Sequence, residues 1–427
     1  MKKKVLYSLL LMSLLTFLAG TGTAVATVFL QCPGDLNGDA VPDPKLLDIN
    51  GIPTAQDNPD YDPNVVCKHI TGGDGFTVMA DGRDMYMFSF GDYTGQTPLE
   101  LVVPNNALKA LLPAPLITVE EGQELYLTMT NVTMVMRPDL FDPHSVHWHG
   151  FPNAAPIFDG LPEPSPTANM GASFTYYYKA VVPGTFFYHC HVEAAEHMQM
   201  GMIGNLWVYP RQDRVGYDVT GDGIPDPETI AGRMGGTGPY GYVYNDEDGS
   251  TAYDVEYPVQ LIGFDSGFHD ASLGVAALPF AAMDDNYTLV NGRGYPDTIN
   301  PANLTNREGF DAQTVPTIIE AASGERILLR VSNVSTTHNY AIATTLGKPM
   351  WVCGRGAAIL RGPDGKDTSY WVNVLPVGGG QMYDVIIDTT GVEGGTYFLY
   401  ATTLENLANG DEERGGLMTE IRISPAI

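Results

Sequence analysis

The sequence has little positive charge. Its 427 residues include 22 lysine and arginine side chains against 50 aspartate and glutamate side chains, which gives a formal net charge of −28. A field of this sign repels polyanions, so nucleic acids and anionic membranes are poor partners. It attracts cations, and a small or metal-ion reductant or a basic redox protein is compatible with it. Solubility of an exported protein is an equally good reason for the acidity.

Long apolar runs are also scarce. Lys2-Lys3-Lys4, an apolar run over residues 5–18 and the small residues Ala24-Val25-Ala26 are typical of a cleaved bacterial signal peptide over residues 1–26. No later segment has the roughly 18 uninterrupted apolar residues that a membrane span requires. We therefore expect an exported, soluble protein, periplasmic or extracellular, with a retained N-terminal anchor as the alternative.

Cysteine is rare, with four in the chain. Cys32 and Cys67 are candidates for a disulfide in an oxidising compartment, and Cys353 is expected to be a small buried hydrophobic residue. Cys190 differs from these because it stands between two histidines, in Tyr188-His189-Cys190-His191. It is therefore the candidate metal ligand.

Long amphipathic helical patterns are absent, and 48 glycines and 31 prolines interrupt nearly every run. Alternation of apolar and polar residues over 125–129 and 174–178 has the period of half-buried strands. These features favour antiparallel β-sandwiches. We expect an Asp/Gly/Pro-rich leader over 27–75, a first β domain over 76–210, an acidic Gly-rich linker over 211–255 and a second β domain over 256–427.

The strongest motif is the segment 188–191 followed by His197 and Met202, which is matched upstream by a segment with three histidines over 144–149. A mononuclear blue copper site needs one thiolate, two imidazoles and a weak axial thioether. The four residues predicted to supply them are His144, Cys190, His197 and Met202.

These two motifs resemble those of the multicopper oxidases, specifically bacterial forms built from two cupredoxin domains. Segments 76–87 and 183–187 resemble strands of the first domain in that family, and 290–293 and 382–385 resemble parts of the second. The resemblance implies an all-β fold of two cupredoxin-like Greek-key β-sandwich domains, with copper as cofactor. In the family, electrons pass from the blue copper through the cysteine to its flanking histidines, which hold a trinuclear cluster that reduces dioxygen. By resemblance, Cys190, His189 and His191 are catalytic, and His147 and His149 complete this half of the cluster.

The second domain departs from the family pattern. Aligning 395–402 with 184–191 puts Tyr400, Ala401 and Thr402 where histidine, cysteine and histidine would stand. Aligning 338–343 with 144–149 puts Ala341 and Ala343 at two further ligand positions. The chain then offers four of the eight histidines that a trinuclear cluster usually has, and we expect the second domain to bind no copper.

Three functions remain open. The first is a copper-dependent oxidase that takes single electrons from a small reductant or metal ion and uses dioxygen as acceptor. Its cluster would be completed in a homotrimer or other oligomer, by unexpected ligands or by a different partner chain. The second is an electron carrier or copper-binding protein with an incomplete, non-catalytic cluster. The third is a nitrite-reductase-like enzyme, although His191 directly after Cys190 fits the oxidases better.

Three aspartate-rich loops form a second pattern. In each loop, oxygen-bearing side chains occupy positions one, three, five and nine, and a glycine at position four permits the turn, as in calcium loops. No loop has a glutamate at position twelve, so none is a complete EF-hand, and solvated acidic turns are the alternative. The candidate calcium ligands are Asp35, Asn37, Asp39 and Asp43, then Asp218, Thr220, Asp222 and Asp226, and finally Asp246, Asp248, Ser250 and Asp254.

Overall fold

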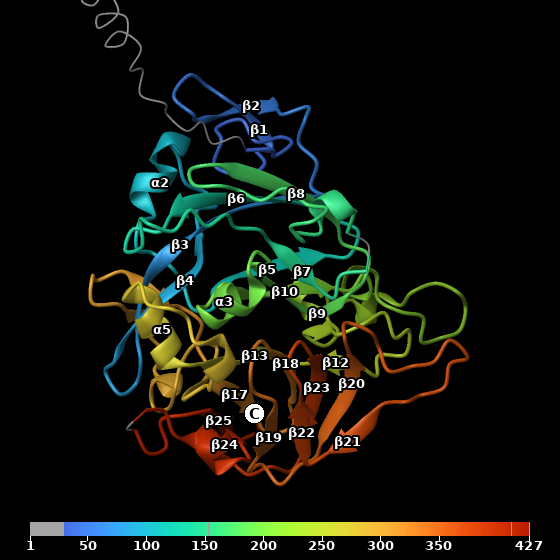
Figure 1. Ribbon diagram of the computed structural model, residues 1–427. Helices are drawn as coiled ribbons and strands as arrows, with labels where there is room; N and C mark the ends of the chain where they lie inside the picture. The colour runs from blue at the N-terminus through green and yellow to red at the C-terminus, as the bar shows by residue number, and fades with distance from the viewer. Residues whose placement is uncertain (1–29, 153, 411, 427) are drawn as a thin grey trace, which may run out of the picture.

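Two β-sandwiches follow each other along the chain in the computed structural model. The structure describes residues 30–152, 154–410 and 412–426, so the expected signal peptide lies outside the described residues. Figure 1 shows the first sandwich, coloured blue to green, above the second, coloured yellow to red. The longest described helix is α5 (Ser266–Leu273), and no described helix is long and apolar enough to cross a membrane. The predicted all-β fold of two cupredoxin-like sandwiches is confirmed.

The first sandwich packs two four-stranded sheets. One has the order β4 (Asp84–Asp92), β3 (Val65–Val78), β6 (Glu124–Thr133) and β8 (Ser173–Lys179). The other has the order β5 (Ala114–Glu120), β10 (Ile203–Tyr209), β9 (Gly184–His189) and β7 (His147–His149). Strand β3 begins inside the segment predicted as leader. The sequence pattern did not reveal this start, because three of the four residues at 72–75 are glycines, which interrupt the alternation of a strand.

The second sandwich repeats this plan. One sheet has the order β14 (Tyr287–Val290), β13 (Val255–Phe264), β18 (Arg326–Asn333), β23 (Met382–Asp388), β20 (Met350–Arg355) and β21 (Tyr370–Val372). The other has the order β17 (Ile319–Ala322), β25 (Met418–Ser424), β24 (Gly395–Ala401), β19 (Tyr340–Thr344) and β22 (Val374–Val377). The parallel pairs β3·β6 and β5·β10 recur as β13·β18 and β17·β25.

A buried asparagine confirms the repeat. The side-chain amide of Asn131 at the end of β6 donates to two carbonyls of the following loops, and its side-chain oxygen accepts from a backbone N–H two residues on. Asn333 at the end of β18 makes the same three bonds. The partners are Asp142, Ala168 and Thr133 in the first sandwich, and His338, Val377 and Ser335 in the second.

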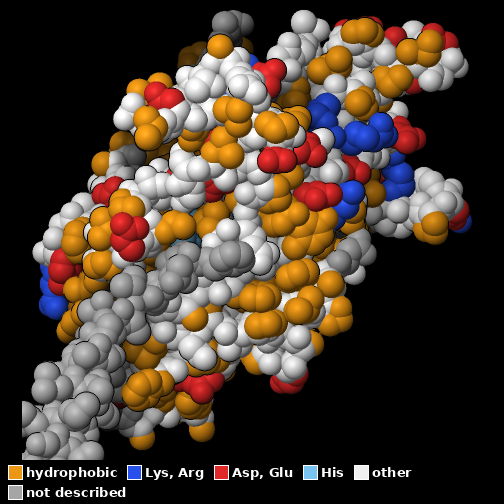
Figure 2. Space-filling view, turned by 90° about the horizontal axis from the view of Figure 1, so that it is seen from above, with side chains coloured by type: hydrophobic (Ala, Val, Ile, Leu, Met, Phe, Trp, Pro, Cys, Tyr) orange, Lys and Arg blue, Asp and Glu red, His pale blue; other side chains and the backbone are white. Residues whose placement is uncertain are grey.

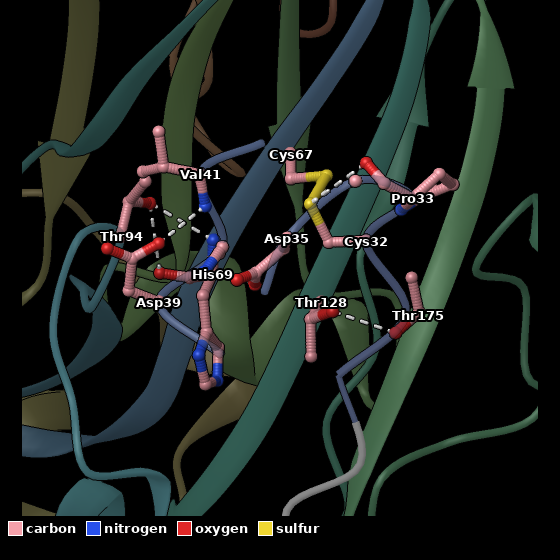
Figure 3. The surroundings of a disulfide bond; sticks show 12 residues. Cys32, Pro33, Asp35, Asp39, Val41, Cys67, His69, Thr94, Thr128 and Thr175 are labelled. Atoms are coloured by element: carbon pink, nitrogen blue, oxygen red, sulfur yellow. Dashed lines mark hydrogen bonds between the residues drawn. A yellow bond between two sulfur atoms is a disulfide. The ribbon is translucent and has the colours of Figure 1, made fainter. Parts of the chain in front are cut away.

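Shorter elements connect the strands. The leader carries β1 (Lys45–Leu47) and β2 (Pro53–Asp57), and Cys32 is joined to Cys67 of β3 by the predicted disulfide, which Figure 3 shows. Cys353 is buried, as expected. Figure 2, seen from above, shows acidic side chains scattered among apolar ones on the leader side. The remaining elements are η1 (Leu99–Leu101), α2 (Val102–Asn105), η2 (Pro156–Phe158), α3 (Ala194–Gln199), α4 (Gln212–Val215), η3 (Pro227–Thr229), η4 (Gly232–Met234), β11 (Gly241–Tyr242), β12 (Ala252–Tyr253), η5 (Phe280–Ala282), η6 (Asp297–Ile299), β15 (Leu304–Thr305), β16 (Asp311–Gln313) and η7 (Leu404–Leu407).

The two sandwiches meet along β9, which is buried along its whole length. Arg330 of β18 is fully buried there and contacts Glu256 at 2.7 Å and the Thr185 hydroxyl at 3.2 Å. The hydroxyl of Thr185 in turn donates to Asp384 of β23. A buried charge is stable only when it is paired and hydrogen-bonded, so this group fixes β9 against the second sandwich.

Replacing Arg330 tests that role. Arg330→Met is expected to lower the free energy of unfolding by about 3–5 kcal/mol, because it leaves Glu256 and Asp384 buried without their cation. Arg422→Met is the matched control, since Arg422 pairs with Glu420 at 2.8 Å but is 42% exposed; its cost should stay below about 1 kcal/mol. Denaturant unfolding of both variants measures the difference. Equal losses would mean that the buried group contributes no more than a surface pair.

Candidate metal centre

The first candidate ligand group is buried in the first sandwich. His144, Cys190 and His197 each place a ligand atom within 4.8 Å of the other two, and all three are fully buried. Cys190 directly follows β9, His197 belongs to α3, and His144 precedes β7. The structure thus brings together residues that lie as far apart in the sequence as positions 144 and 197.

The sulfur of Cys190 lies at the middle of this group. His197 Nδ1 is 3.2 Å from Cys190 Sγ, and the backbone N–H of Ser145 donates to the same sulfur at 3.4 Å. Burial lowers the pKa of His197, but the Cys190 sulfur and the Asp142 carboxylate outweigh it and raise this pKa to about 10. Metal binding at this group therefore competes with a proton on His197.

The surroundings of His144 fit a metal better than a packed imidazole. Both of its ring nitrogens are buried without a hydrogen-bond partner, whereas buried polar atoms are normally paired. Met202 lies beside it, because both side chains pack against Gly72 of β3: a Cβ there would be 2.9 Å from His144 Cδ2 and 3.4 Å from Met202 Cε. One thiolate, two imidazoles and a thioether are the donor set that suits copper.

The second group lies on the other side of Cys190. His147, His149 and His189 place ligand atoms within 4.8 Å of one another. The ring of His191 is 5.2 Å from that of His147 and 5.5 Å from that of His189, measured between centroids. All four predicted histidines of the half-cluster are thus gathered, and they are less deeply enclosed than the first group, since His147, His149 and His191 are half-buried.

Backbone carbonyls hold one ring nitrogen of two histidines in this second group. His147 Nδ1 contacts the carbonyl of Asp159 at 2.6 Å, and His189 Nδ1 contacts the carbonyl of Cys190 at 2.9 Å. Each ring therefore turns Nε2 the other way, and Nε2 of His189 lies 3.4 Å from Nδ1 of His149. A partner on one ring nitrogen is what orients a metal-binding histidine. Burial lowers the pKa of His149 to about 4 and holds that of His189 well below its usual value, so both imidazoles are neutral and able to bind a metal.

Trp148, between two of these histidines, points to the opposite side. It is buried, stacks on Phe151 with centroids 4.2 Å apart and contacts Tyr178 at 4.9 Å. Successive residues of a strand face opposite sides, so Trp148 fills the core while His147 and His149 face the metal group. Trp148 is therefore a core aromatic residue.

Strand pairing corrects the expected alignment of the second domain. Ala343 lies opposite Tyr400, just as His147 lies opposite His189. The positions of His147 and His149 are therefore taken by Ala343 and Thr345, two residues later than Ala341 and Ala343. The sequence alignment placed His338 opposite His144. In the structure the Asn333 side chain donates to the carbonyl of His338, as the Asn131 side chain donates to the carbonyl of Asp142. His338 therefore corresponds to Asp142.

The three remaining histidines lie away from both groups. His69 Nε2 pairs with Thr130 at 2.8 Å. Both ring nitrogens of His269 face backbone carbonyls, those of Tyr86 and Gln199, and His338 lies 3.6 Å from Asp284. All nine histidines of the chain fall in the described residues, so none from the second domain completes the half-cluster within one chain.

The acidic loops fold alike but differ in their neighbours. In the first, the carboxylate of Asp35 accepts backbone N–H groups of Asn37, Gly38 and Ala40, and Asp218 accepts those of Gly221 and Gly223. Asp35 and Asp39 lie close to the disulfide in Figure 3. In the third loop, the guanidinium of Arg361 contacts Asp248 at 3.0 Å and Ser250 at 3.2 Å. Because Arg361 already supplies positive charge there, the third loop is the poorest calcium candidate.

Three methionines alternate along the chain at Met198, Met200 and Met202, but they do not form an accessible row of sulfur ligands. Met200 and Met202 are fully buried, and only Met198 is partly exposed. Core packing therefore accounts for Met200, and the contact with Gly72 accounts for Met202.

Comparisons with known proteins agree with this geometry. Residues 99–213 match a multicopper oxidase family model. Laccase-1 of Emericella nidulans is 30% identical over 128 residues, which are 30% of this chain and 19% of that protein. Multicopper oxidase MmcO of Mycobacterium tuberculosis is 41% identical over 83 residues, which are 19% of this chain and 14% of that protein. The chain thus matches less than a fifth of the length of these curated relatives.

A solved structure resembles almost the whole chain. The blue copper oxidase from Nitrosomonas europaea has a TM-score of 0.58 and 24% identity, covering 84% of this chain and 85% of that one. At this identity the likeness shows the fold, while the family match over 99–213 includes every histidine of both candidate groups.

Gly72→Ala tests the geometry of the first group. Its methyl group would press on the His144 ring, so we expect copper-loaded protein to lose at least about tenfold in copper affinity, the size of effect seen when a supporting residue of a metal site is changed. Gly395→Ala is the control, because Gly395 also lies in a strand and a Cβ there would come no closer than 3.7 Å to another side chain.

Cys190→Ser should abolish the intense visible absorption of a copper thiolate altogether. Unchanged colour in Cys190→Ser would disprove the ligand assignment.

Proposed function

We propose that this chain, whose residues 99–213 match a multicopper oxidase family model within a fold of two cupredoxin-like sandwiches, is an exported copper-dependent oxidase. Single electrons from a small reductant or metal ion enter at the group of Cys190, His144, His197 and Met202. They leave through His189 and His191 for the four-histidine group, where dioxygen is the acceptor. The family match implies copper as cofactor; His144, Cys190, His197 and Met202 would hold it, and it would supply one-electron redox chemistry, since such a soft donor set suits both Cu(I) and Cu(II).

One observation carries this proposal. His189, Cys190 and His191 are consecutive, and Cys190 joins the buried sulfur group while its two neighbours join the histidine group. Ser145 braces the junction, since its N–H donates to the Cys190 sulfur and its hydroxyl accepts from the N–H of His191. An electron carrier has no use for four further histidines gathered beside its cysteine.

The protein shields the electron-entry group from water. Phe88 packs edge-on against His197 with ring centroids 5.7 Å apart, and the N–H of Cys190 donates to the carbonyl of Met202. This packing holds the ligands in one geometry, which limits the reorganisation that accompanies a change of charge.

The number of histidines favours an alternative, an electron carrier or copper-binding protein. Nine histidines minus the two of the first group leave seven, fewer than the eight of the usual trinuclear cluster. In a trimer of identical chains, each of the three clusters would again have seven histidines available. An oxidase built from this chain therefore needs other ligand types or a different partner chain. A nitrite-reductase-like activity is a third possibility, and His191 directly after Cys190 argues for the oxidase instead.

Oxygen uptake separates these functions. We expect the copper-loaded protein to consume dioxygen when given a one-electron donor. A double variant, His147→Ala with His149→Ala, should keep its blue absorption but lose oxygen uptake by about a hundredfold or more. His338→Gln is the control, since His338 lies outside both groups. If the donor bleaches the blue band of the wild type but no oxygen is consumed, the chain is a carrier; uptake that survives in the double variant would contradict the assigned acceptor site.

We also propose that the loops at Asp35–Asp43 and Asp218–Asp226 bind calcium and stiffen the segments beside the copper domain. Chelation of calcium should then lower the melting temperature without bleaching the blue band, because a ligand that binds only the folded state stabilises it. Asp35→Asn combined with Asp218→Asn should remove the calcium dependence, whereas Asp248→Asn in the Arg361-paired loop should not. A melting temperature that calcium leaves unchanged would identify the loops as ordinary acidic turns.

A further inference from the structure

The second sandwich meets the four-histidine group at the ring of His149. The Nδ1 atom of this ring faces Nε2 of His189 at 3.4 Å, and the ring stacks on Phe187 with centroids 4.2 Å apart. Its other edge, formed by Cε1 and Nε2, lies against Gly380 in the turn that follows β22. A Cβ at Gly380 would be 3.5 Å from both of these ring atoms. The backbone of a sandwich that carries none of the candidate ligands therefore borders the metal centre.

The backbone of Gly380 presents a carbonyl to this edge of the ring. Burial lowers the pKa of His149 to about 4, and a hydrogen bond to the Gly380 backbone acts in the opposite direction by raising it. Only an acceptor raises the pKa of an imidazole in this way, because it pairs with the N–H of the charged ring. His149 therefore offers Nε2 to the carbonyl of Gly380 and Nδ1 to His189.

The turn that carries Gly380 repeats one in the first sandwich. The N–H of Gly380 donates to the carbonyl of Asn333 at 2.9 Å, as the N–H of Gly171 donates to that of Asn131 at 2.9 Å. Both glycines have a left-handed backbone, with φ +76° and +72°, which favours glycine over any residue with a side chain. The turn thus belongs to the frame that both sandwiches share, and only the second copy of it lies against a histidine.

Two side chains fix this turn. The side-chain oxygen of Asn339 accepts the N–H of Gly379 at 3.0 Å, and that of Gln381 accepts the N–H of Gly378 at 2.9 Å. The two residues before Gly380 are therefore tied to side chains on either side of the turn. A carbonyl in a turn held in this way keeps its direction, which is the property that a hydrogen-bond partner of a metal-binding histidine needs.

The proton on the neutral His149 ring has two possible places, and they have opposite consequences. On Nδ1 it would be donated to His189 Nε2, and the two rings would close on each other. On Nε2 it is donated to Gly380, and Nδ1 turns a lone pair toward His189. The proton of His189 lies on Nδ1, 2.9 Å from the Cys190 carbonyl, so its Nε2 also carries a lone pair. Two lone pairs that face each other at 3.4 Å repel unless a cation lies between them.

We propose that Gly380 is a positioning residue for His149: its carbonyl keeps the proton on Nε2 and so holds Nδ1 open for a cation. This inference rests on the proposed function, in which the four-histidine group is the acceptor site. It gives the second sandwich, where Tyr400, Ala401 and Thr402 stand at the aligned ligand positions, a part in the metal centre. The second sandwich supplies the hydrogen bond behind a ligand in place of a ligand.

Histidine tautomers in the metal-free protein test this role. In protein labelled with nitrogen-15 in its histidine rings, two-bond proton–nitrogen correlations show which nitrogen carries the proton, and His149→Gln identifies the signals of His149. We expect the proton on Nε2 in the wild type. Gly380→Leu should move it to Nδ1, because a Cβ there already touches the ring and the rest of the side chain has to displace the ring or the turn.

Gly347→Leu is the matched control. Gly347 also lies in the second sandwich with φ +70°, so the substitution causes similar backbone strain, but a Cβ there meets nothing within 4 Å. Its His149 signals should match the wild type. Asn339→Ala combined with Gln381→Ala is a second route to the same result, because it loosens the turn without adding atoms beside the ring, and it keeps the test valid should Gly380→Leu fail to fold.

Copper titration followed by electron paramagnetic resonance gives the second readout. Copper beyond the blue centre should bind at least about tenfold more weakly in Gly380→Leu and in the double variant than in the wild type and Gly347→Leu, the size of effect expected when the outer partner of a metal-binding histidine is lost. The blue absorption should stay the same in all four proteins, since His149 lies outside that centre.

A wild-type proton on Nδ1 of His149, or copper binding that neither variant weakens, would overturn the role of Gly380. Loss of the blue absorption in the same variants would also overturn it, because the turn would then support the whole domain and not one ring. A proton on Nε2 in a copper-loaded protein that consumes no dioxygen is a different result: it would refute the proposed oxidase and leave the role of Gly380 standing.

Discussion

The placement of the Cys190 sulfur is the constraint on which the rest of the structure depends. This one side chain has to lie within reach of His197 and His144 while its neighbours His189 and His191 face the other way. Strand β9 achieves this by being buried on both sides, with the first sandwich packed on one face and the Arg330 group of the second sandwich on the other. Ser145, which lies just before strand β7 in the chain, then holds both Cys190 and His191 through hydrogen bonds.

The second sandwich shows what remains when the ligands are lost from such a frame. The N–H of Ala401 donates to the carbonyl of Leu417, as the N–H of Cys190 donates to that of Met202. Tyr340, Ala401 and Leu417 are all buried where His144, Cys190 and Met202 stand in the first sandwich. The strand order and the buried asparagine are kept, so the scaffold does not depend on the metal. A tyrosine, an alanine and a leucine in place of the three ligands keep the interior packed.

The sequence predicted which of these side chains lie together because their spacing is local: a histidine-cysteine-histidine triplet and two histidines on one strand fix which side chains share a face. The disulfide was predictable from the small number of cysteines. The register of the second domain was not, since His338 imitates a ligand and only strand pairing shows that Ala343 and Thr345 stand opposite the correct residues. Strand β3 was placed too late because its glycines, one of which makes room for His144, hide the apolar pattern.

Whether Cys190 joins two copper-binding groups is the central question, and copper stoichiometry per chain with electron paramagnetic resonance on the same sample tests it most directly. The account predicts more than one copper per chain, with a blue-type signal and additional copper that disappears in the His147→Ala, His149→Ala double variant. A single copper per chain with only the blue-type signal, the same in wild type and double variant, would contradict it and leave an electron carrier.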